Sequence, residues 1–397
     1  MRSAARAAVS RLRAARCATA WIFFANGAAL GSWIPHIPDA KHALALSDGM
    51  LGLALLGMAA GSLIGLPLSG FLTARFGSGR TTTAAIFALL LATPLPILAP
   101  SLPVFALALA LLGTANGAVD VAMNAQAIAI EERYGRAIMS SFHALFSAGD
   151  LAGAAVAALA MEIGIDPTAH LLAALASLSI VTLWAVSLLL PTRPSAMRTP
   201  LLRLPRGVLL VLGMLTLCSL LAEGAIGDWA AVYLKDDLAT ASSFAALGFA
   251  VFSFAMTAGR FLGDHLVRRY GGPIVLGTGT GAAALVLATS LLAGVPGFAL
   301  VGFAAIGLGL ANAVPVLFSA AGKIPGTPPE LTIAAVSTAG YCGFLLGPPA
   351  IGLIADHFTL PVGLGVVALA LAIVALGGAS AAWEGQGRWT VLSNASK

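Results

Sequence analysis

LGTANGAVDVAMNAQAIAIEER, residues Leu112–Arg133, is an apolar run with polar side chains spaced along its centre. Asn116, Asp120 and Asn124 recur every four residues, so on a helix they share one face. Asp120 stands roughly 16 Å from the charged end of the run, near the middle of a ~30 Å hydrocarbon core. An ionisable group at that depth is costly unless it faces a partner or a wet cavity. The stretch therefore predicts a membrane-crossing helix with a functional face.

The composition of the 397-residue chain predicts an all-α membrane protein. The chain is 59% hydrophobic and only 9% charged, with a mean hydropathy of +0.96, whereas soluble domains carry about 25% charged residues. Backbone groups in lipid must be satisfied internally, which leaves helices or a closed barrel. Barrel strands alternate polar and apolar residues over ~10 positions. The apolar runs here are continuous over about 20 residues, the length of a membrane-spanning helix.

Twelve apolar runs can be drawn as membrane spans, and their loops predict the orientation. With the N-terminus inside, all of the 21 Lys and Arg residues except Lys41 and Lys235 fall on the inner side. Basic residues accumulate in cytoplasmic loops, so both termini are expected in the cytoplasm. The arginines before the first run resemble a signal peptide, but Asn26 and Gly27 interrupt that run, which favours an uncleaved first helix. The runs are 17–37, 48–72, 81–99, 102–130, 137–163, 168–190, 207–233, 243–266, 273–292, 297–321, 330–356 and 361–383.

The chain is expected to consist of two pseudo-symmetric six-helix bundles. The longest polar break, Pro191–Arg206, is rich in proline and basic residues and reads as a linker. We therefore expect an N-terminal bundle at 1–192, a cytoplasmic linker at 193–206 and a C-terminal bundle at 207–397. The halves share weak repeats at a nearly constant offset, such as Gly-x-Ala-Asn ending at Asn116 and again at Asn312. Duplicated halves predict a solute site at their interface near the midplane.

Several functional classes find no support in the sequence. Cys17, Cys218 and Cys342 lie in or beside apolar runs at unrelated spacings, which suggests neither a metal site nor a disulfide framework. No Walker loop, HExxH motif or nucleophile elbow is present. A membrane enzyme would need such a cluster, and a sensor would need a long polar output domain. We expect neither an enzyme nor a cofactor beyond protons as the coupling ion.

Two loop motifs resemble the signature of the major facilitator superfamily. Residues 70–80, GFLTARFGSGR, are similar to the family's loop between spans two and three, and residues 259–271, GRFLGDHLVRRYG, are similar to its counterpart in the second half. The resemblance implies twelve spans in two bundles and a cytoplasmic gate. Ala74 stands where the family usually has an aspartate, so the carboxylate of the gate would be Asp264. The implied gate residues are Arg75, Arg80, Arg260, Asp264, Arg268 and Arg269.

Within that superfamily, four segments resemble the fucose–proton symporter group and a bacterial inner-membrane branch of it. In the symporter, the position matching Asp120 is a glutamate implicated in proton coupling. A second acid on its first helix has no match here, where Gly31 and Ser32 stand. The resemblance implies a multi-pass protein of the bacterial inner membrane. The matching segments are DVAMN at 120–124, EGAIGDW at 223–229, NAVPVLFS at 312–319 and STAGYCGFLLGPP at 337–349.

Four ionisable residues inside the spans are candidates for proton coupling. Burial favours the neutral form of Asp120, so it could take up and release a proton during a cycle, or it could be locked by its asparagine neighbours. Glu223 could bind solute hydroxyls or serve as a second proton site; alternatively it could form a salt bridge to Arg260 or lie at the membrane interface. His143 and Asp150 are seven residues apart and share a helix face, as in a proton relay or an inert helix–helix contact.

A further set of polar and aromatic residues is expected to bind the solute. The amides and Tyr341 could hydrogen-bond a polar solute, and Trp33 could stack on a sugar ring or simply pack. Trp229 is expected nearer the outer surface, as an aromatic anchor at the membrane interface. The full set is Asn26, Trp33, Asn116, Asn124, Gln126, Asn312 and Tyr341.

These features favour a secondary active transporter that moves a small polar solute, a sugar or a related metabolite, by alternating access coupled to protons. The alternative is an efflux pump for amphipathic compounds, against which the polar residues in the fourth, fifth and seventh spans argue mildly. The expected partners are the solute and the lipid bilayer, not nucleic acid, and the expected form is a monomer.

Overall fold

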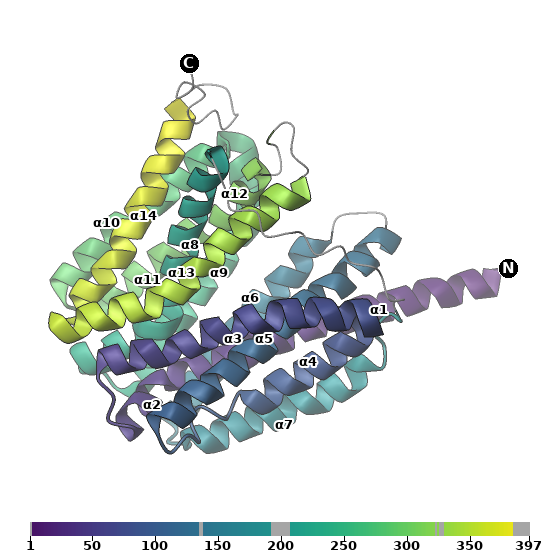
Figure 1. Ribbon diagram of the computed structural model, residues 1–397, viewed down its shortest axis with the longest axis horizontal. Coiled ribbons are helices and arrows are strands. Elements are labelled where there is room, and N and C mark those ends of the chain that lie inside the picture. Colours follow the sequence, from purple (N-terminus) through teal and green to yellow (C-terminus); the bar gives the residue numbers. More distant parts are fainter. Residues whose placement is uncertain (1, 135–137, 192–206, 322–323, 325–328, 384–397) are drawn as a thin grey trace. The chain divides into compact units, whose positions relative to one another are not determined.

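The structure is a computed structural model that describes residues 2–134, 138–191, 207–321, 324 and 329–383. Within these residues every regular element is helical. Eleven helical segments are long and apolar enough to cross a membrane, and Ser78–Ala92 is a shorter apolar helix. Each of the twelve predicted runs overlaps one of these segments, so the predicted all-α membrane fold is confirmed (Figure 1).

The chain forms two compact units, here called unit 1 and unit 2. Unit 1 comprises Met1–Leu46 with Ala54–Thr199, and unit 2 comprises Ser47–Leu53 with Pro200–Lys397. The predicted linker at 193–206 lies outside the described residues. The helices of unit 1 are α1 (Arg2–Trp33), η1 (Ile34–His36), α2 (Ile37–Ala43), α3 (Asp48–Phe76), α4 (Ser78–Ala92), α5 (Leu102–Tyr134), α6 (Met139–Glu162) and α7 (Pro167–Val186), with the first turn of α3 counted in unit 2.

Unit 2 follows the same order of long helices, and its fourth span is broken. This span divides into α11 and α12 around Ala311 and Asn312, three residues before Pro315, which cannot donate a backbone hydrogen bond. The helices are α8 (Val208–Val232), η2 (Tyr233–Asp237), α9 (Ser242–Tyr270), α10 (Gly272–Ala293), α11 (Pro296–Leu310), α12 (Ala313–Ala321), α13 (Pro329–His357) and α14 (Leu360–Trp383).

Glycine holds α1 and α6 together in unit 1. A Cβ added at Gly31 would overlap the backbone carbonyl oxygen of Asp150, and one at Gly149 would overlap that of Phe24. Small residues let membrane helices approach at backbone distance, where van der Waals contacts replace the hydrophobic effect that lipid removes. This packing fixes the residues of α6, including Asp150, against α1 (Figure 1).

Glycine and serine hold α3 against α5 in the same unit. A Cβ at Gly61 would overlap the carbonyl oxygen of Ala110. The hydroxyls of Ser62 and Ser69 donate to the carbonyl oxygens of Gly113 and Ala118 at 3.0 and 2.7 Å. The side of α5 that makes these contacts is therefore covered by α3, and the polar groups of α5 lie on another face of the helix.

Unit 2 repeats this scheme between α8 and α13. A Cβ at Gly343 of α13 would overlap the carbonyl oxygen of Leu217 in α8. At the far end of α13, the first turn of α3 belongs to the same unit, and Ser47 Oγ donates to Asp356 Oδ2 at 2.9 Å. The two units thus use the same small-residue packing to hold neighbouring helices together.

Candidate functional site

The polar residues of α5 lie on one partly exposed face, here called the unit 1 polar face: Asn116, Asp120 and Asn124. Each of the three is partly exposed, whereas Val119 and Ala122 between them are buried. Asp120 is nine residues from the exposed Leu111, which places the two about 180° apart around the helix. The polar face therefore points away from the apolar, exposed face of α5.

Asp120 is hydrogen-bonded by an amide from its own helix. Asn124 Nδ2 donates to Asp120 Oδ1 at 3.0 Å and to the backbone oxygen of Asp120 at 2.8 Å. The amide donor therefore lies one turn along the same helix as the carboxylate that it holds.

Asn26 of α1 brings a second amide beside α5. It is 1% exposed, and its Nδ2 lies 3.7 Å from Sδ of Met123, the residue before Asn124. Its Oδ1 has no hydrogen-bond partner within the described residues. Buried polar atoms in proteins are almost always paired, so an unpaired amide oxygen here is an available acceptor.

His143 and Asp150 of α6 share the face of their helix that is turned from its apolar side. Asp150 is nine residues before the exposed Leu159, hence about 180° from it around the helix. His143 is exposed, and the edge of its ring meets Phe23 of α1 with centroids 5.3 Å apart. Figure 1 shows α1, α5 and α6 in contact within unit 1, so three neighbouring helices supply its polar groups.

In unit 2 the ionisable residues meet across two helices. Arg260 Nη2 of α9 lies 3.8 Å from Glu223 Oε1 of α8, and the side chains are 31% and 29% exposed. Glu223 is nine residues from the exposed Met214, so it too points away from the apolar side of its helix. The salt bridge considered for Glu223 from the sequence is present.

Aromatic and amide groups from other segments contact the residues that adjoin this ion pair in α8 and α9. An ideal Cβ at Gly224 would lie 2.6 Å from Phe344 Cδ1, so the ring of Phe344 packs against α8 at Gly224, the residue after Glu223. The ring of Tyr341 is 6.0 Å from that of Phe344. Asn312, in the break between α11 and α12, donates from Nδ2 to the carbonyl oxygen of Gly259 at 3.2 Å. We call Glu223, Arg260, Asn312, Tyr341 and Phe344 the unit 2 polar cluster.

Comparison with known proteins identifies the family. No family model matches the chain. An uncharacterized MFS-type transporter of Yersinia pestis is 39% identical over 355 residues, covering 89% of this chain and 92% of that protein. The chain belongs to the major facilitator superfamily. It is thus a multi-pass membrane transporter, and no catalytic activity is indicated.

Solved structures of this superfamily share the fold at low sequence identity. A D-xylose–proton symporter superposes with a TM-score of 0.72 at 17% identity, covering 92% of this chain and 96% of the symporter. A point mutant of the nucleoside transporter NupG gives a TM-score of 0.73 at 12% identity, covering 92% of this chain and 98% of NupG. The resemblance to the fucose–proton symporter group stays a prediction.

Gln126 has a structural role in this transporter. It is fully buried; its Nε2 donates to Ser78 Oγ at 2.8 Å and to the carbonyl oxygen of Leu190 at 3.0 Å, and its Oε1 accepts from Leu190 N at 3.1 Å. These bonds tie α5 to the start of α4 and to the segment after α7. Gln126 is predicted as a solute ligand, but its hydrogen bonds are used within the protein, so we omit it from the proposed site.

The two tryptophans considered from the sequence are both buried. Trp33 is 0% exposed and its ring lies 6.3 Å from that of Phe105, so packing is its observed role. Trp229 is also 0% exposed and contacts the position of Gly352. The expectation that Trp229 anchors the protein at the membrane interface is wrong, because its ring is enclosed between α8 and α13.

The predicted gate residues divide into two groups. Arg260 lies at Glu223 rather than at the end of its helix, and the side chain of Asp264 lies outside the described part. The others are exposed near helix ends: Arg75 stacks over the ring of Phe76 at 5.5 Å, and Arg269 over that of Tyr270 at 5.4 Å. The exposed set is Arg75, Arg80, Arg268 and Arg269.

Sequence reasoning missed a buried histidine pair in unit 1. His36 Nε2 lies 2.9 Å from His170 Nδ1, and His36 Nδ1 lies 3.0 Å from Asp39 Oδ2. Both histidines are buried, and His170 Nε2 has no partner in the described chain. The sequence signal that could have located His170 is Asp166-Pro167, a typical helix start, which begins α7 and places His170 in its first turn. Among the described residues no group of His, Cys, Asp and Glu could hold a metal ion.

Proposed function

We propose that this transporter moves a small polar solute, a sugar or a related hydroxyl-rich metabolite, by alternating access in symport with protons. The observation that carries the proposal is Asp120, a carboxylate on the partly exposed face of a membrane helix, held by the amide of Asn124. An intramembrane carboxylate that faces away from lipid is a functional-site candidate by default, and proton transfer is one of the roles such residues serve.

The unit 2 polar cluster supports the solute class. A carboxylate and a guanidinium bind hydroxyl groups by directed hydrogen bonds, and Tyr341 and Phe344 offer aromatic faces to a sugar ring. The two solved transporters with this fold are named for a sugar and for nucleosides, which carry hydroxyl groups. In unit 1, the unpaired Oδ1 of Asn26 adds an acceptor for a hydroxyl donor.

The proposed setting is the bacterial inner membrane, with both termini in the cytoplasm and the protein acting as a monomer. The support is the position of the basic residues, which all fall on one side of the predicted spans except Lys41 and Lys235. Basic loops stay in the cytoplasm during insertion.

The test begins by finding the solute and then separates binding from coupling. A thermal-shift screen of the purified protein against sugars, nucleosides, organic acids and amphipathic drugs identifies ligands, because a ligand at 100 times its dissociation constant adds about 2.7 kcal/mol to the free energy of unfolding. Uptake of the ligand is then measured in proteoliposomes with an imposed pH gradient. Exchange of labelled for unlabelled solute, without a gradient, is measured in parallel.

Asp120→Asn keeps the size of the side chain and one acceptor oxygen for Asn124 Nδ2 but cannot be ionised. The variant should lose accumulation against a concentration gradient while retaining exchange, so that inside and outside concentrations become equal. Asp120→Glu, which remains ionisable, is the matched control and should retain part of the accumulation. Full accumulation by Asp120→Asn would overturn the coupling role. If only amphipathic drugs raise the melting temperature in the screen, the result would favour an efflux pump.

A further inference from the structure

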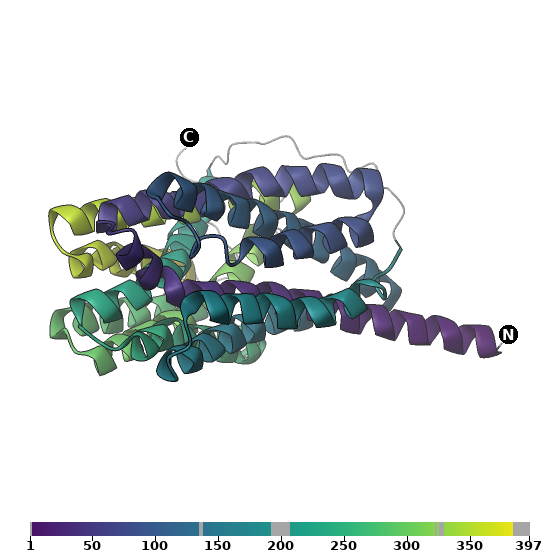
Figure 2. The same cartoon turned by 90° about the horizontal axis from the view of Figure 1, so that it is seen from below.

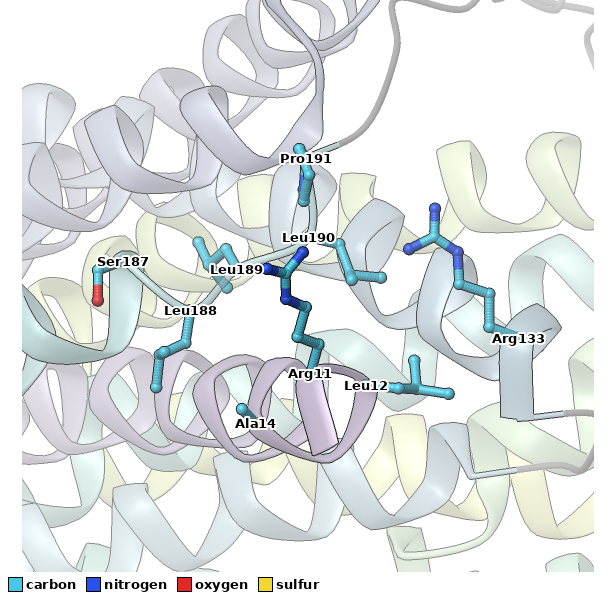
Figure 3. Close-up of a pocket in the computed structure, with 9 residues that line it drawn as sticks. All are labelled: Arg11, Leu12, Ala14, Arg133, Ser187, Leu188, Leu189, Leu190 and Pro191. Carbon is cyan, nitrogen blue, oxygen red and sulfur yellow. The ribbon is translucent and has the colours of Figure 1, made fainter. Parts of the chain in front are cut away.

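A pocket at one end of unit 1 is lined by residues other than those of the unit 1 polar face. Its volume is about 650 Å³, and it lies between the start of α1, the end of α5 and the segment that follows α7. Pockets of 300–1,000 Å³ are typical of small-ligand sites. Figure 3 shows Arg11 of α1 and Arg133 of α5 extending along it, on either side of Leu190 in that view. We call it the basic pocket.

The basic pocket combines two cations with an apolar floor. Arg11 and Arg133 are exposed, and neither has an ion-pair partner in the described part of the chain. Its other lining is mainly aliphatic, from Leu12 and the segment Leu188–Leu190. Guanidinium groups match the geometry of phosphate oxygens through paired hydrogen bonds. A ligand with a phosphodiester and an attached apolar part would use both features.

The position of the pocket along the helices matches the headgroup layer of a membrane. Trp184, one turn before the lining residue Ser187, is 65% exposed, and Leu183 beside it is 63% exposed. Tryptophan is enriched where the hydrocarbon core meets the headgroups. We therefore infer that the guanidiniums beyond this level lie at the depth of lipid phosphates. Figure 2 shows α1 and α7 side by side along this end of the unit.

The floor of the pocket is fixed by internal contacts. Both backbone groups of Leu190 are hydrogen-bonded to Gln126, at 3.1 and 3.0 Å. The guanidinium of Arg16 stacks over the ring of Tyr134 at 5.3 Å, which ties α1 to the end of α5. A site whose walls are already held in place loses less conformational freedom on binding.

We propose that the basic pocket binds the headgroup of an anionic phospholipid, with its phosphodiester between Arg11 and Arg133 and its glycerol backbone over Leu188–Leu190. The lipid would join the start of α1 to the ends of α5 and α7. We choose a lipid over free phosphate because a small hydrated ion would make no apolar contact with the aliphatic floor or with the exposed Trp184, whereas a lipid would contact both. The site is independent of the solute and of proton coupling.

The full chain is tested in detergent with added lipid. Retention of phosphatidylglycerol by native mass spectrometry and the shift in melting temperature are compared with those for phosphatidylcholine, inorganic phosphate and glycerophosphoglycerol, the headgroup without acyl chains. Phosphatidylglycerol should be retained and should raise the melting temperature more than any of the other three. Equal effects of phosphatidylcholine, or equal effects of inorganic phosphate, would overturn the proposal.

Variants locate the binding to the pocket. Arg11→Gln and Arg133→Gln should each weaken retention of phosphatidylglycerol about fivefold, and the double variant more. Arg13→Gln is the matched control, because Arg13 is exposed on the same helix, carries the same charge and does not line the pocket. An equal loss in Arg13→Gln would show general charge attraction and overturn the site. The melting temperatures without lipid confirm that each variant is folded.

Discussion

The two units pack their helices alike but treat their acidic residues differently. In unit 1, Asp120 is held at 3.0 Å by an amide of its own helix, whereas in unit 2 Glu223 faces a guanidinium of another helix at 3.8 Å. The glycine contacts between α1 and α6 have their counterpart between α8 and α13. In both units the packing places polar groups away from the apolar sides of the helices. The neighbouring side chain, an amide in unit 1 and a guanidinium in unit 2, then sets the electrostatic environment of the acid.

This difference suggests a division of labour within the transporter. An amide neighbour is a neutral hydrogen-bond donor, whereas a guanidinium brings a full positive charge and favours the ionised form of the acid it faces more strongly. Under the proposed function, unit 1 would supply the proton site and unit 2 would supply directed charges for the solute. Three sets of substitutions, in order of decreasing expected effect, test the packing that the units share and the features in which they differ.

The largest effect is expected where the two units are alike. Gly31→Leu places a side chain on the carbonyl oxygen of Asp150, and Gly343→Leu does the same at Leu217. Overpacking typically costs about 1–3 kcal/mol and occasionally more, and the overlap with rigid backbone puts both variants at the upper end. Both should show little folded protein by size-exclusion chromatography. Gly365→Leu, at a position with nothing within 4 Å, is the control. Normal folding of either packing variant would show that the close contact is not required.

A smaller effect is expected at the buried histidine pair of unit 1. His170→Leu leaves Nε2 of the buried His36 without its partner at 2.9 Å. An unsatisfied buried polar group costs about 1–3 kcal/mol. The melting temperature should fall accordingly, and adding His36→Leu should cost less than the sum of the two single losses. Simple additivity would show that the two rings do not interact.

The smallest effect is expected at the ion pair that distinguishes unit 2. Glu223→Gln and Arg260→Gln should each lower the free energy of unfolding by about 1 kcal/mol, between the values for exposed and for buried pairs, since both side chains are about a third exposed. The double variant should recover part of the loss, because neither charge then remains without the other. A double-mutant cycle from thermal unfolding measures this coupling. A coupling energy of zero between Glu223 and Arg260 would show that the ion pair does not stabilise unit 2, and the proposed electrostatic difference between the units would be wrong.

Much of the fold follows from local features of the sequence. The helix bounds match the apolar runs within a few residues at most ends, as for α6 and α13, because hydrophobic length and the residues that break helices act locally. The polar face of α5 was also predicted, because a four-residue spacing on one helix fixes its members on one side. The interfacial role of Trp229 was predicted wrongly, because apparent depth along a span does not say which neighbours enclose a side chain.

What the sequence by itself determined is therefore the set of spans, the family signature and the periodic placement of Asp120. Only the tertiary structure decided which polar groups meet: Glu223 with Arg260, Gln126 with Leu190, and His36 with His170. The physical reason is that hydropathy and periodicity act within one helix, whereas these contacts join segments far apart in the chain. Their geometry depends on how closely glycine allows two backbones to approach.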